Sequence, residues 1–514
     1  MRGGVWEKRS LDGLVSLPAA SIGRKIPAWL TIVLVLCTAL LFAYELASVN
    51  AISGWSFDDL FSLWASEPTF PFLAVFRERI ITDSNPPLYF SLLHLLRQAI
   101  PDDGMVVVAV NVGAIAAAAA AVYMPSRQAG VSGLAIAGIA AFALSGPVLY
   151  FAAEGRSYVM ALSIVFVASW HAALVILGFP ALTLKRAAIL GCLAALTHVY
   201  AALFCGSIAA GLLTVGLCCK RKELLKPSLA LGLSASLVFA IWLGIAFDTL
   251  GRIAWIEFSA IGVLSAALSV KEIALGSNLL AIVLLVIFFY GLLNKKSRPL
   301  FLVFLIAFLL FALLPIITSF VQPILRNRYW LIGAAAFPVL MLFAARTWIL
   351  EKVEAPAGNR LAAGSTVLCL LVASSVLGIA NAKHYLPSKG FWRGADLVRP
   401  LLAHCQEGSV HVYYENPSNP YVSLPWEMWD FHKLTGAPQV VFADTREKAT
   451  PYLDVAASSC PILGWAEDSS DWQKLNDADL IRLLKIRALL NEVQIVRYAT
   501  GFVILKSLSG ASAS

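Results

Sequence analysis

The sequence contains few charged residues for its length. Only 14% of its 514 residues are Asp, Glu, Lys or Arg, whereas 59% are hydrophobic. Soluble globular domains are about 25% charged, so this composition excludes an ordinary soluble protein. Several apolar runs approach the roughly 20 residues that a helix needs to cross a bilayer. The sequence therefore predicts a polytopic α-helical membrane protein.

The sequence also lacks the features of a nucleic-acid-binding or metal-cluster protein. The net charge is +8, but Lys and Arg occur in short clusters between apolar runs, as they do in the cytoplasmic loops of membrane proteins. No nucleic-acid partner is therefore expected. No two of the eight cysteines have the spacing of metal ligands, and no internal repeat is visible.

Three basic clusters determine the expected topology. The positive-inside rule places residues 185–186, 220–222 and 295–298 in the cytoplasm. The stretch 187–219 is too long for one span and suits a hairpin of two short spans. The apex of this hairpin falls at residues 197–200, on the opposite side of the membrane from the basic clusters.

Alternation from these anchors predicts 11 spans. They are 28–47, 104–124, 130–150, 157–178, the two arms of 187–219, 228–247, 277–294, 299–319, 328–347 and 362–382. The segment 86–100 breaks the alternation, because it is marginal in length and carries His94 and Arg97. We expect it to be a re-entrant or interfacial helix; a full crossing there would give 12 or 13 spans. The run 28–47 is longer than a usual signal-peptide core, so an uncleaved span is expected there, with a cleaved signal peptide as the alternative.

The chain is expected to have three parts. Residues 1–27 form a cytoplasmic N-terminus, 28–382 a transmembrane module with a long first periplasmic loop at 48–103, and 383–514 a small periplasmic α/β domain. Within that domain we expect strands at 409–415 and 439–443, a helix at 477–491, and a hairpin of 493–498 with 502–506. Cys405 and Cys460 would lie in an oxidising compartment, and a disulfide between them is expected.

Acidic residues in the first loop and charges at a span end are the first candidates for chemistry. Asp58, Asp59 and Asp83 could bind a divalent cation or act as a base. A solvated loop with a helix cap at Asp83 is the alternative. Glu154 and Arg156 lie between two spans, where charges tend to mark a pathway or a site; the alternative is that they simply end helices in the headgroup layer.

The remaining candidates fall on the same side of the membrane. His198 lies at the hairpin apex, although a lone histidine near an apolar face is more often structural. Arg326 and Arg328 precede a span, where they could clamp a phosphate through bidentate bonds or anchor in lipid headgroups. Each signal is weak alone. The topology was derived from basic clusters elsewhere, yet it gathers all these residues on one face, which favours a functional site.

The order of these motifs resembles that of the C-type integral-membrane glycosyltransferases, in particular the branch of protein O-mannosyltransferases and aminoarabinose transferases. The matching elements, spread over residues 28–350, are Asp58-Asp59, Asp83-Ser84-Asn85-Pro86-Pro87-Leu88-Tyr89, Glu154-Gly155-Arg156-Ser157-Tyr158, Thr197-His198-Val199-Tyr200 and Arg326-Asn327-Arg328-Tyr329. The sequence departs from the family pattern at three positions. Asp59 stands where Glu is usual, Asn85 where His is common, and Val199 is inserted before Tyr200.

The resemblance implies an inverting glycosyltransferase of the bacterial inner membrane that acts on the periplasmic face. Its donor would be a polyprenyl-phosphate sugar, and its acceptor lipid A or lipopolysaccharide core, another glycan or glycolipid, or a protein. The resemblance implies a catalytic role for Asp58, as the base, together with Asp59 and Asp83. It implies that Arg156, Arg326 and Arg328 bind the donor phosphate. Substrate or metal contacts are implied for Glu154, His198, Tyr89, Tyr158 and Tyr329. A divalent cation such as Mg²⁺, Mn²⁺ or Zn²⁺ at Asp58, Asp83 and Glu154 is left open.

A transporter or flippase of lipid-linked sugars is the alternative function. It would line a pathway with the same polar residues, but it predicts charges near the bilayer midplane and broken helices there. This sequence places its charges at helix ends and carries an additional domain at 383–514, which a flippase does not need. A scaffold for envelope assembly would leave the clustering of polar residues unexplained.

Overall fold

The computed structural model describes residues 57–247 and 259–351 with short gaps, together with parts of 398–507 that include a C-terminal sheet. Five helices in these residues are long and apolar enough to cross a membrane. They are α6 (Asp103–Gln128), α9 (Tyr158–Ile176), α11 (Val199–Cys218), α12 (Lys222–Ile245) and α15 (Arg298–Ser319). The protein is therefore a multi-pass membrane protein. The expected spans 28–47 and 362–382 fall almost entirely outside the described residues.

A sixth candidate span is sharply bent. Helix α13 (Ala260–Val270) continues as a π-helix, η3 (Lys271–Leu275), and then meets α14 (Asn278–Leu293) at 91°. Gly276 at the bend has a φ of 74°, a left-handed conformation that glycine adopts without strain. If α14 crosses the membrane as expected for 277–294, α13 runs along its surface.

Two expected spans are divided in the structure. The stretch 130–150 forms two short helices, α7 (Ser132–Ala143) and α8 (Gly146–Phe151), and 328–347 begins as a 3₁₀-helix, η4 (Asn327–Ala336), before α16 (Phe337–Glu351). Pro147 and Pro338 lie in the first turns of α8 and α16. Proline lacks an N–H and suits the first turn of a helix, so each proline lies where a new helical segment begins. Pro125, Pro227 and Pro315 lie inside α6, α12 and α15 without ending them.

The predicted hairpin is present as two helices, but only its second arm is among the candidate spans, since the first arm has 14 residues. Helix α10 (Leu184–Thr197) and α11 are separated only by His198, which ends the first helix and caps the second. Close approach of these helices to their neighbours depends on glycine. A Cβ on Gly211 would lie 2.5 Å from the Val303 carbonyl oxygen of α15, and one on Gly191 would lie 2.6 Å from the Leu231 carbonyl oxygen of α12. Small residues at helix contacts are typical of membrane proteins.

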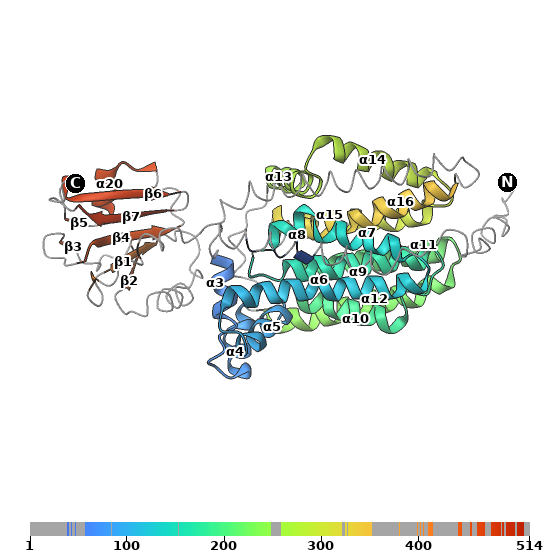
Figure 1. Cartoon of the computed structure of the whole chain (residues 1–514), viewed down its shortest axis with the longest axis horizontal. Coiled ribbons are helices and arrows are strands. Elements are labelled where there is room, and N and C mark those ends of the chain that lie inside the picture. Colours follow the sequence, from blue (N-terminus) through green and yellow to red (C-terminus); the bar gives the residue numbers. More distant parts are fainter. Residues whose placement is uncertain are drawn as a thin grey trace.

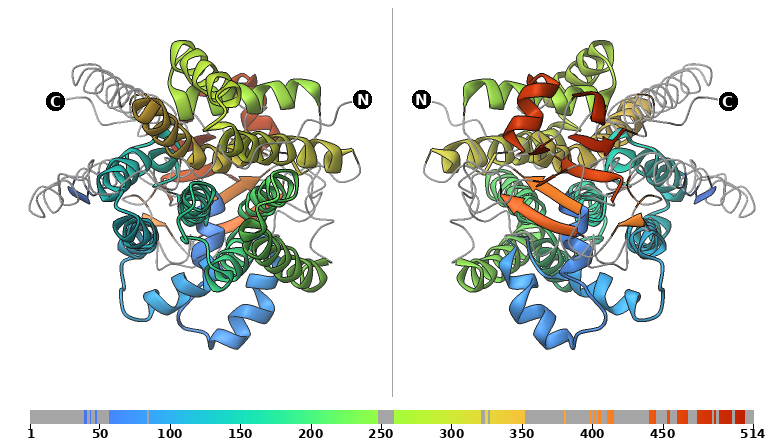
Figure 2. Two further views of the ribbon diagram at one scale, coloured as in Figure 1. Left: turned by 90° about the vertical axis from the view of Figure 1, so that its right-hand side faces the viewer. Right: turned by 90° about the vertical axis from the view of Figure 1, so that its left-hand side faces the viewer.

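The helices form a bundle around α9, in which every residue is buried. Figure 1 shows the long helices lying side by side, and Figure 2 shows the bundle end-on. The outer face of α12 exposes apolar side chains at a spacing of four residues: Leu229, Leu233, Leu237, Ile241 and Ile245. An exposed apolar stripe of this kind suits contact with lipid rather than water.

The first loop contains three α-helices and one short 3₁₀-helix: α3 (Phe57–Trp64), α4 (Phe72–Glu78), η1 (Ile80–Thr82) and α5 (Leu88–Arg97). With 10 residues, α5 is about 15 Å long, which is too short to cross a bilayer. The Arg97 side chain joins the helices of the loop. It pairs with Asp103 at 2.9 Å and donates to the Leu63 carbonyl and to the Ser66 hydroxyl.

The C-terminal part contains a five-stranded sheet with the order β2-β1-β4-β7-β6. Its strands are β1 (Val410–Tyr414), β2 (Val440–Asp444), β4 (Ile462–Glu467), β6 (Val493–Tyr498) and β7 (Gly501–Lys506). Strands β2, β1 and β4 are parallel, whereas β7 is antiparallel to both β4 and β6. The two expected strands and the hairpin are present, and β4 is an additional central strand.

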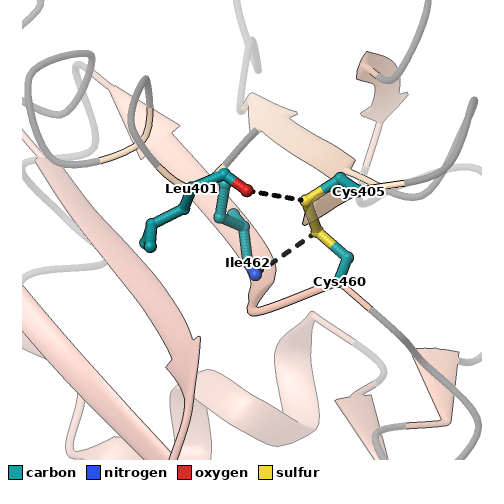
Figure 3. The surroundings of a disulfide bond; sticks show 4 residues. All are labelled: Leu401, Cys405, Cys460 and Ile462. Atoms are coloured by element: carbon teal, nitrogen blue, oxygen red, sulfur yellow. Dashed lines mark hydrogen bonds between the residues drawn. A yellow bond between two sulfur atoms is a disulfide. The ribbon is translucent and has the colours of Figure 1, made fainter. Parts of the chain in front are cut away.

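The helix expected at 477–491 is shorter in the structure. Helix α20 (Asp477–Leu483) is followed by β5 (Ile486–Arg487), which pairs with β3 (Leu453–Asp454), and by the 3₁₀-helix η8 (Leu490–Glu492). Pairing with β3 therefore replaces the second half of the expected helix. Cys405 and Cys460 form a disulfide that links the chain before β1 to the start of β4 (Figure 3). In Figure 1 the sheet lies beyond the end of the bundle at which α3 is found.

Candidate functional site

The bundle has two chemically different ends. Residues 185–186 lie at the start of α10, 220–222 follow α11, and 295–298 precede α15, so all three basic clusters lie at one end, which we call the basic end. His198, between α10 and α11, lies at the opposite end. The segment after α15 also reaches that end, because the Tyr200 hydroxyl donates to the Ile324 carbonyl at 2.8 Å. We call this the site end.

Two acids of the first loop hold the segment 154–156. The Asp59 side chain is buried in α3 and accepts a hydrogen bond from the Gly155 N–H at 2.6 Å. The Asp83 carboxylate pairs with the Arg156 Nη1 atom at 2.6 Å, and both side chains are only 10% exposed. Asp83 also accepts from the backbone and side-chain N–H groups of Asn85. Residues nearly 100 positions apart in sequence are thus joined.

Aromatic rings lie beside Arg156 in addition to the Asp83 carboxylate. Its guanidinium lies over the rings of Phe61 and Phe90, at 5.2 and 5.9 Å from their centroids. Aromatic faces attract a cation, and a water-poor environment strengthens its pairing with a carboxylate. Tyr89, the neighbour of Phe90 on α5, is fully buried, and its hydroxyl has no hydrogen-bond partner among the described residues. Burial, and then the Asp59 carboxylate, raise the pKa of Tyr89 well above its usual value, so the hydroxyl stays protonated.

Asn111 is a site residue that the sequence interpretation missed. It lies buried in α6, and its Nδ2 atom donates to the carbonyl oxygens of Ala152 and Glu154 at 3.0 and 3.5 Å. The segment that carries Glu154 and Arg156 is therefore held by Asn111 as well as by Asp59. A single amide within an apolar span was the available signal, since polar residues in spans tend to have a specific partner.

Aromatic rings form the other half of the site. The His198 ring lies 5.4 Å from Tyr158 of α9 and 5.5 Å from Tyr329 of η4. The Arg328 guanidinium lies over both tyrosines, at 5.5 and 5.7 Å from their ring centroids. Tyr200, a second residue not counted among the expected site residues, packs on Tyr329 at 4.9 Å. These contacts bring the start of α9, the hairpin apex and η4 together.

His198 is held as a neutral hydrogen-bond donor. Its Nδ1 atom accepts from the Tyr200 N–H at 3.1 Å, so the proton of the neutral ring lies on Nε2. Burial, followed by the charges of Arg328 and Arg156, lowers the pKa of His198 to about 3. Its Nε2 atom is buried and finds no partner among the described residues. A ligand with an acceptor oxygen would satisfy this donor.

Several positive electrostatic features lie around His198, whereas the acids Asp59, Asp83 and Glu154 lie around residues 154–156. Both Arg156 and Arg328 act on its pKa, and the N-termini of α9 and α11 lie beside it. Helix N-termini carry partial positive charge and unsatisfied N–H groups, which favour an anion. The site is therefore suited chemically to a phosphate or carboxylate.

The structure gathers nine of the residues expected from the sequence at the site end. They are Asp59, Asp83, Tyr89, Glu154, Arg156, Tyr158, His198, Arg328 and Tyr329. Glu154 is buried beside Gly155. The side chain of Asp58, in α3, and all of Arg326 lie outside the described residues.

The candidate metal set Asp58, Asp83 and Glu154 is not tested, because the Asp58 side chain lies outside the described residues. Among the residues that are described, no group of three or more His, Cys, Asp or Glu residues is placed to hold a metal ion. Asp83 is paired with Arg156 instead. His198 uses Nδ1 to accept from a backbone N–H, so its other nitrogen carries a proton and is not a metal ligand in this arrangement.

No protein-family model matches the chain, and no curated protein matches it significantly. The order of motifs therefore remains a resemblance, and what it implies about activity is a proposal.

Proposed function

We propose that the chain is a membrane glycosyltransferase that moves a sugar from a polyprenyl-phosphate donor to an envelope acceptor. The observation that carries this proposal is the grouping of Arg156, Arg328 and the neutral donor His198 at the N-termini of α9 and α11. A lipid phosphate needs this combination of cations and donors at the membrane boundary. The motif order seen in the sequence supports the same activity.

In the proposed reaction the acceptor hydroxyl attacks the anomeric carbon of the donor sugar. Asp58 takes the hydroxyl proton as the oxygen forms its bond to that carbon. The bond between the anomeric carbon and the phosphate oxygen breaks, and its electron pair leaves with the phosphate. Arg156, Arg328 and, by the motif order, Arg326 stabilise the phosphate charge as it develops. A single displacement inverts the anomeric configuration.

The other site residues have positioning roles in this proposal. Asp59 and Asn111 hold the backbone before Arg156, and Asp83 orients its guanidinium. Tyr200 holds the Ile324 carbonyl in the segment before Arg328. Because a guanidinium has five N–H donors, it can hold a carboxylate and a phosphate at once. Misplacement of a catalytic group by about 1 Å can cost about 10²-fold in rate.

The orientation in the membrane is part of the proposal. The positive-inside rule places the basic end in the cytoplasm and the site end on the opposite, periplasmic face of an inner membrane. The Cys405–Cys460 disulfide supports this placement of residues 383–514, since disulfides persist in oxidising compartments. The acceptor would then be lipid A, lipopolysaccharide core, another glycan or glycolipid, or a protein.

A flippase of lipid-linked sugars remains the rival function. It predicts charged residues along a path through the bundle and broken helices there. The bundle does contain broken helices, at α7–α8, α13–α14 and η4–α16, so the charges are what discriminate. In the five candidate spans, Asp, Glu, Lys and Arg occur only within five residues of a helix end. This distribution favours chemistry at a membrane boundary over transport across it.

The test is transfer by the purified full-length chain in proteoliposomes. Polyprenyl phosphates bearing radiolabelled hexoses or pentoses are supplied with lipid A, core oligosaccharide and peptide acceptors. We expect release of polyprenyl phosphate with an inverted glycosidic product, and loss of release in Asp58→Asn but not in Glu78→Gln, an exposed acid of the same loop. Movement of donor across the bilayer without release would establish the flippase instead. Normal turnover of Asp58→Asn would remove Asp58 from the role of base.

A further inference from the structure

A group of large apolar side chains around α4 is exposed at the site end. Phe70, Phe72 and Leu73 are 45, 42 and 57% exposed, and Leu95 on the neighbouring helix α5 is 56% exposed. We call these four residues the α4 patch. Val75 and Ile80 of the same segment are buried, so the segment has an inner face that packs on the protein and an outer face that does not. Exposed apolar groups of this kind indicate a contact surface.

The α4 patch is continuous with surface that the bundle presents to lipid. Helix α5 packs on α6 and α10. Met105 at the start of α6 is 64% exposed, and Ile189 and Leu193 of α10 are also exposed. In the end-on views of Figure 2, α4 and α5, drawn in blue, lie at the edge of the bundle rather than on its axis. The α4 patch therefore lies beside the helices at the level where they end.

The charges around the α4 patch suit the headgroup layer. Arg77 is exposed and lies four residues after Leu73, so the two share a face of α4. Arg79 lies over the rings of Phe70 and Trp64, at 4.4 and 4.7 Å from their centroids. Glu67 and Glu78 act electrostatically on Arg79, so Arg77 is the cation suited to contact with lipid. Apolar groups next to a cation are the pattern of a helix that lies in the membrane interface.

We infer that α4 is a membrane-interface anchor whose patch is seated in the headgroup and acyl-chain boundary of the leaflet at the site end. Its occupant is the bilayer that the bundle spans, with Arg77 directed to lipid phosphates. Helices of this kind bury their apolar face to a depth of about 5–10 Å. This inference does not depend on the proposed transferase activity.

The anchor has a direct connection to the site. Arg79 donates from Nη1 to the Trp64 carbonyl at 2.7 Å, and Trp64 is the last residue of α3. Asp59 in the same helix holds Gly155 next to Arg156. The depth of α4 in the leaflet thus sets the position of α3 along the membrane normal. Through the Asp59–Gly155 hydrogen bond it also sets the position of the segment that carries Arg156.

The test measures the depth of α4 in a bilayer. A dansyl-bearing amino acid is introduced at position 73 or, as the control, at position 78 of the full chain in single-chain nanodiscs. The discs contain phosphatidylglycerol and lipids with a nitroxide at a shallow acyl carbon. Leu73 and Glu78 are both exposed but point about 140° apart on the helix. We expect quenching at position 73 to exceed that at position 78 by about twofold or more, as for a residue below the headgroups.

Equal quenching at the two positions would overturn the inference. Quenching at position 73 that is weak in single-chain discs, together with protection that appears only when discs hold two chains, would assign the patch to a second copy and equally overturn it. Amide hydrogen exchange of the unsubstituted chain gives an independent measurement. Exchange of residues 72–76 should slow when phosphatidylglycerol replaces a neutral lipid in the discs, and an unchanged rate would contradict the role of Arg77.

Discussion

The two ends of the helical bundle use charge in opposite ways. At the basic end Lys185, Lys220, Lys222, Lys295, Lys296 and Arg298 are exposed. An ion pair recorded there is local, between Arg221 and Glu223. At the site end Asp59, Glu154 and Arg156 are buried, and the partners of Asp59 and Arg156 are far away in sequence. At the first end most cations are exposed, although Arg221 also donates to the Ile176 and Val175 carbonyls. At the second end buried charged residues have specific partners.

This difference shows that charges at the two ends have different physical roles. Exposed cations contribute little to stability individually, but together they set orientation. Removing one partner of a buried ion pair lowers the free energy of unfolding by about 3–5 kcal/mol, because the other partner is left charged and unpaired. Charge removal should therefore have large effects at the site end and small ones at the basic end. Four predictions test this contrast.

The largest effect is expected for Arg156→Gln. It leaves the Asp83 carboxylate without its guanidinium and should lower the free energy of unfolding by about 3–5 kcal/mol. The proposed transfer should fall by about 10²-fold or more, since a cation facing the leaving phosphate is lost. Urea unfolding in micelles and the transfer assay measure the two effects. Arg298→Gln, which changes an exposed cation at the other end, is the matched control and should behave as wild type.

Removal of the His198 donor should have the next largest effect. His198→Phe keeps a ring but loses Nε2–H, and a hydrogen bond to a charged group contributes about 1.5–3 kcal/mol. We therefore expect affinity for polyprenyl phosphate to fall by about 10- to 100-fold. His198→Asn, which keeps an N–H donor, should recover part of it. Equal affinity of the wild-type and Phe chains would show that the imidazole does not face the phosphate.

The same histidine should make stability depend on pH. Its folded pKa of about 3 lies below the unfolded value of about 6.5, so the unfolded state binds the proton more readily. Stability from neutral His198 is complete above pH 6.5 and is lost as pH falls toward 3. The unfolding midpoint of wild type should therefore decline more steeply over this window than that of His198→Asn. Parallel curves would contradict a buried neutral imidazole.

A small effect is expected for Tyr200→Phe, which removes one hydroxyl. The lost bond to the Ile324 carbonyl is worth about 1 kcal/mol, so donor affinity should fall about fivefold through movement of the Arg328 segment. Tyr290→Phe, at a half-exposed tyrosine of α14, should leave affinity unchanged. If both variants bind alike, the segment before Arg328 is positioned by other contacts.

The sequence predicted nine of the residues that gather at the site end, but it did not predict Asn111 or Tyr200. The Asp58 side chain and Arg326 lie outside the described residues. Basic clusters at 185–186 and 220–222 placed the hairpin apex at His198, and topology alone put the other candidates on that side. Charge counting could not predict that Asp59 would accept from Gly155 or that Asp83 would pair with Arg156. Those choices depend on how α3 and α5 pack against the start of α9, which no local pattern encodes.

The errors in the expected fold also have physical causes. The broken segments at 130–150 and 328–347 restart at Pro147 and Pro338, which a hydropathy window does not register. Prolines inside α6, α12 and α15 do not break those helices, so proline position alone does not predict the breaks either. In the C-terminal part the helical pattern at 477–491 gave way to pairing of β5 with β3, a long-range contact that overrode local propensity. Asn111 and Tyr200 act through backbone carbonyls of distant segments, so only coordinates reveal their roles.

The most direct test of the account is binding of polyprenyl phosphate, without sugar, to the purified full-length chain by native mass spectrometry. Polyprenol lacking the phosphate is the comparison ligand. We predict that wild type and Arg298→Gln retain polyprenyl phosphate and discriminate against polyprenol, whereas Arg328→Gln binds the two alike. Equal retention of both lipids by wild type would contradict a phosphate site at the site end of the bundle. A loss of polyprenyl-phosphate binding in Arg298→Gln as large as that in Arg328→Gln would contradict it as well.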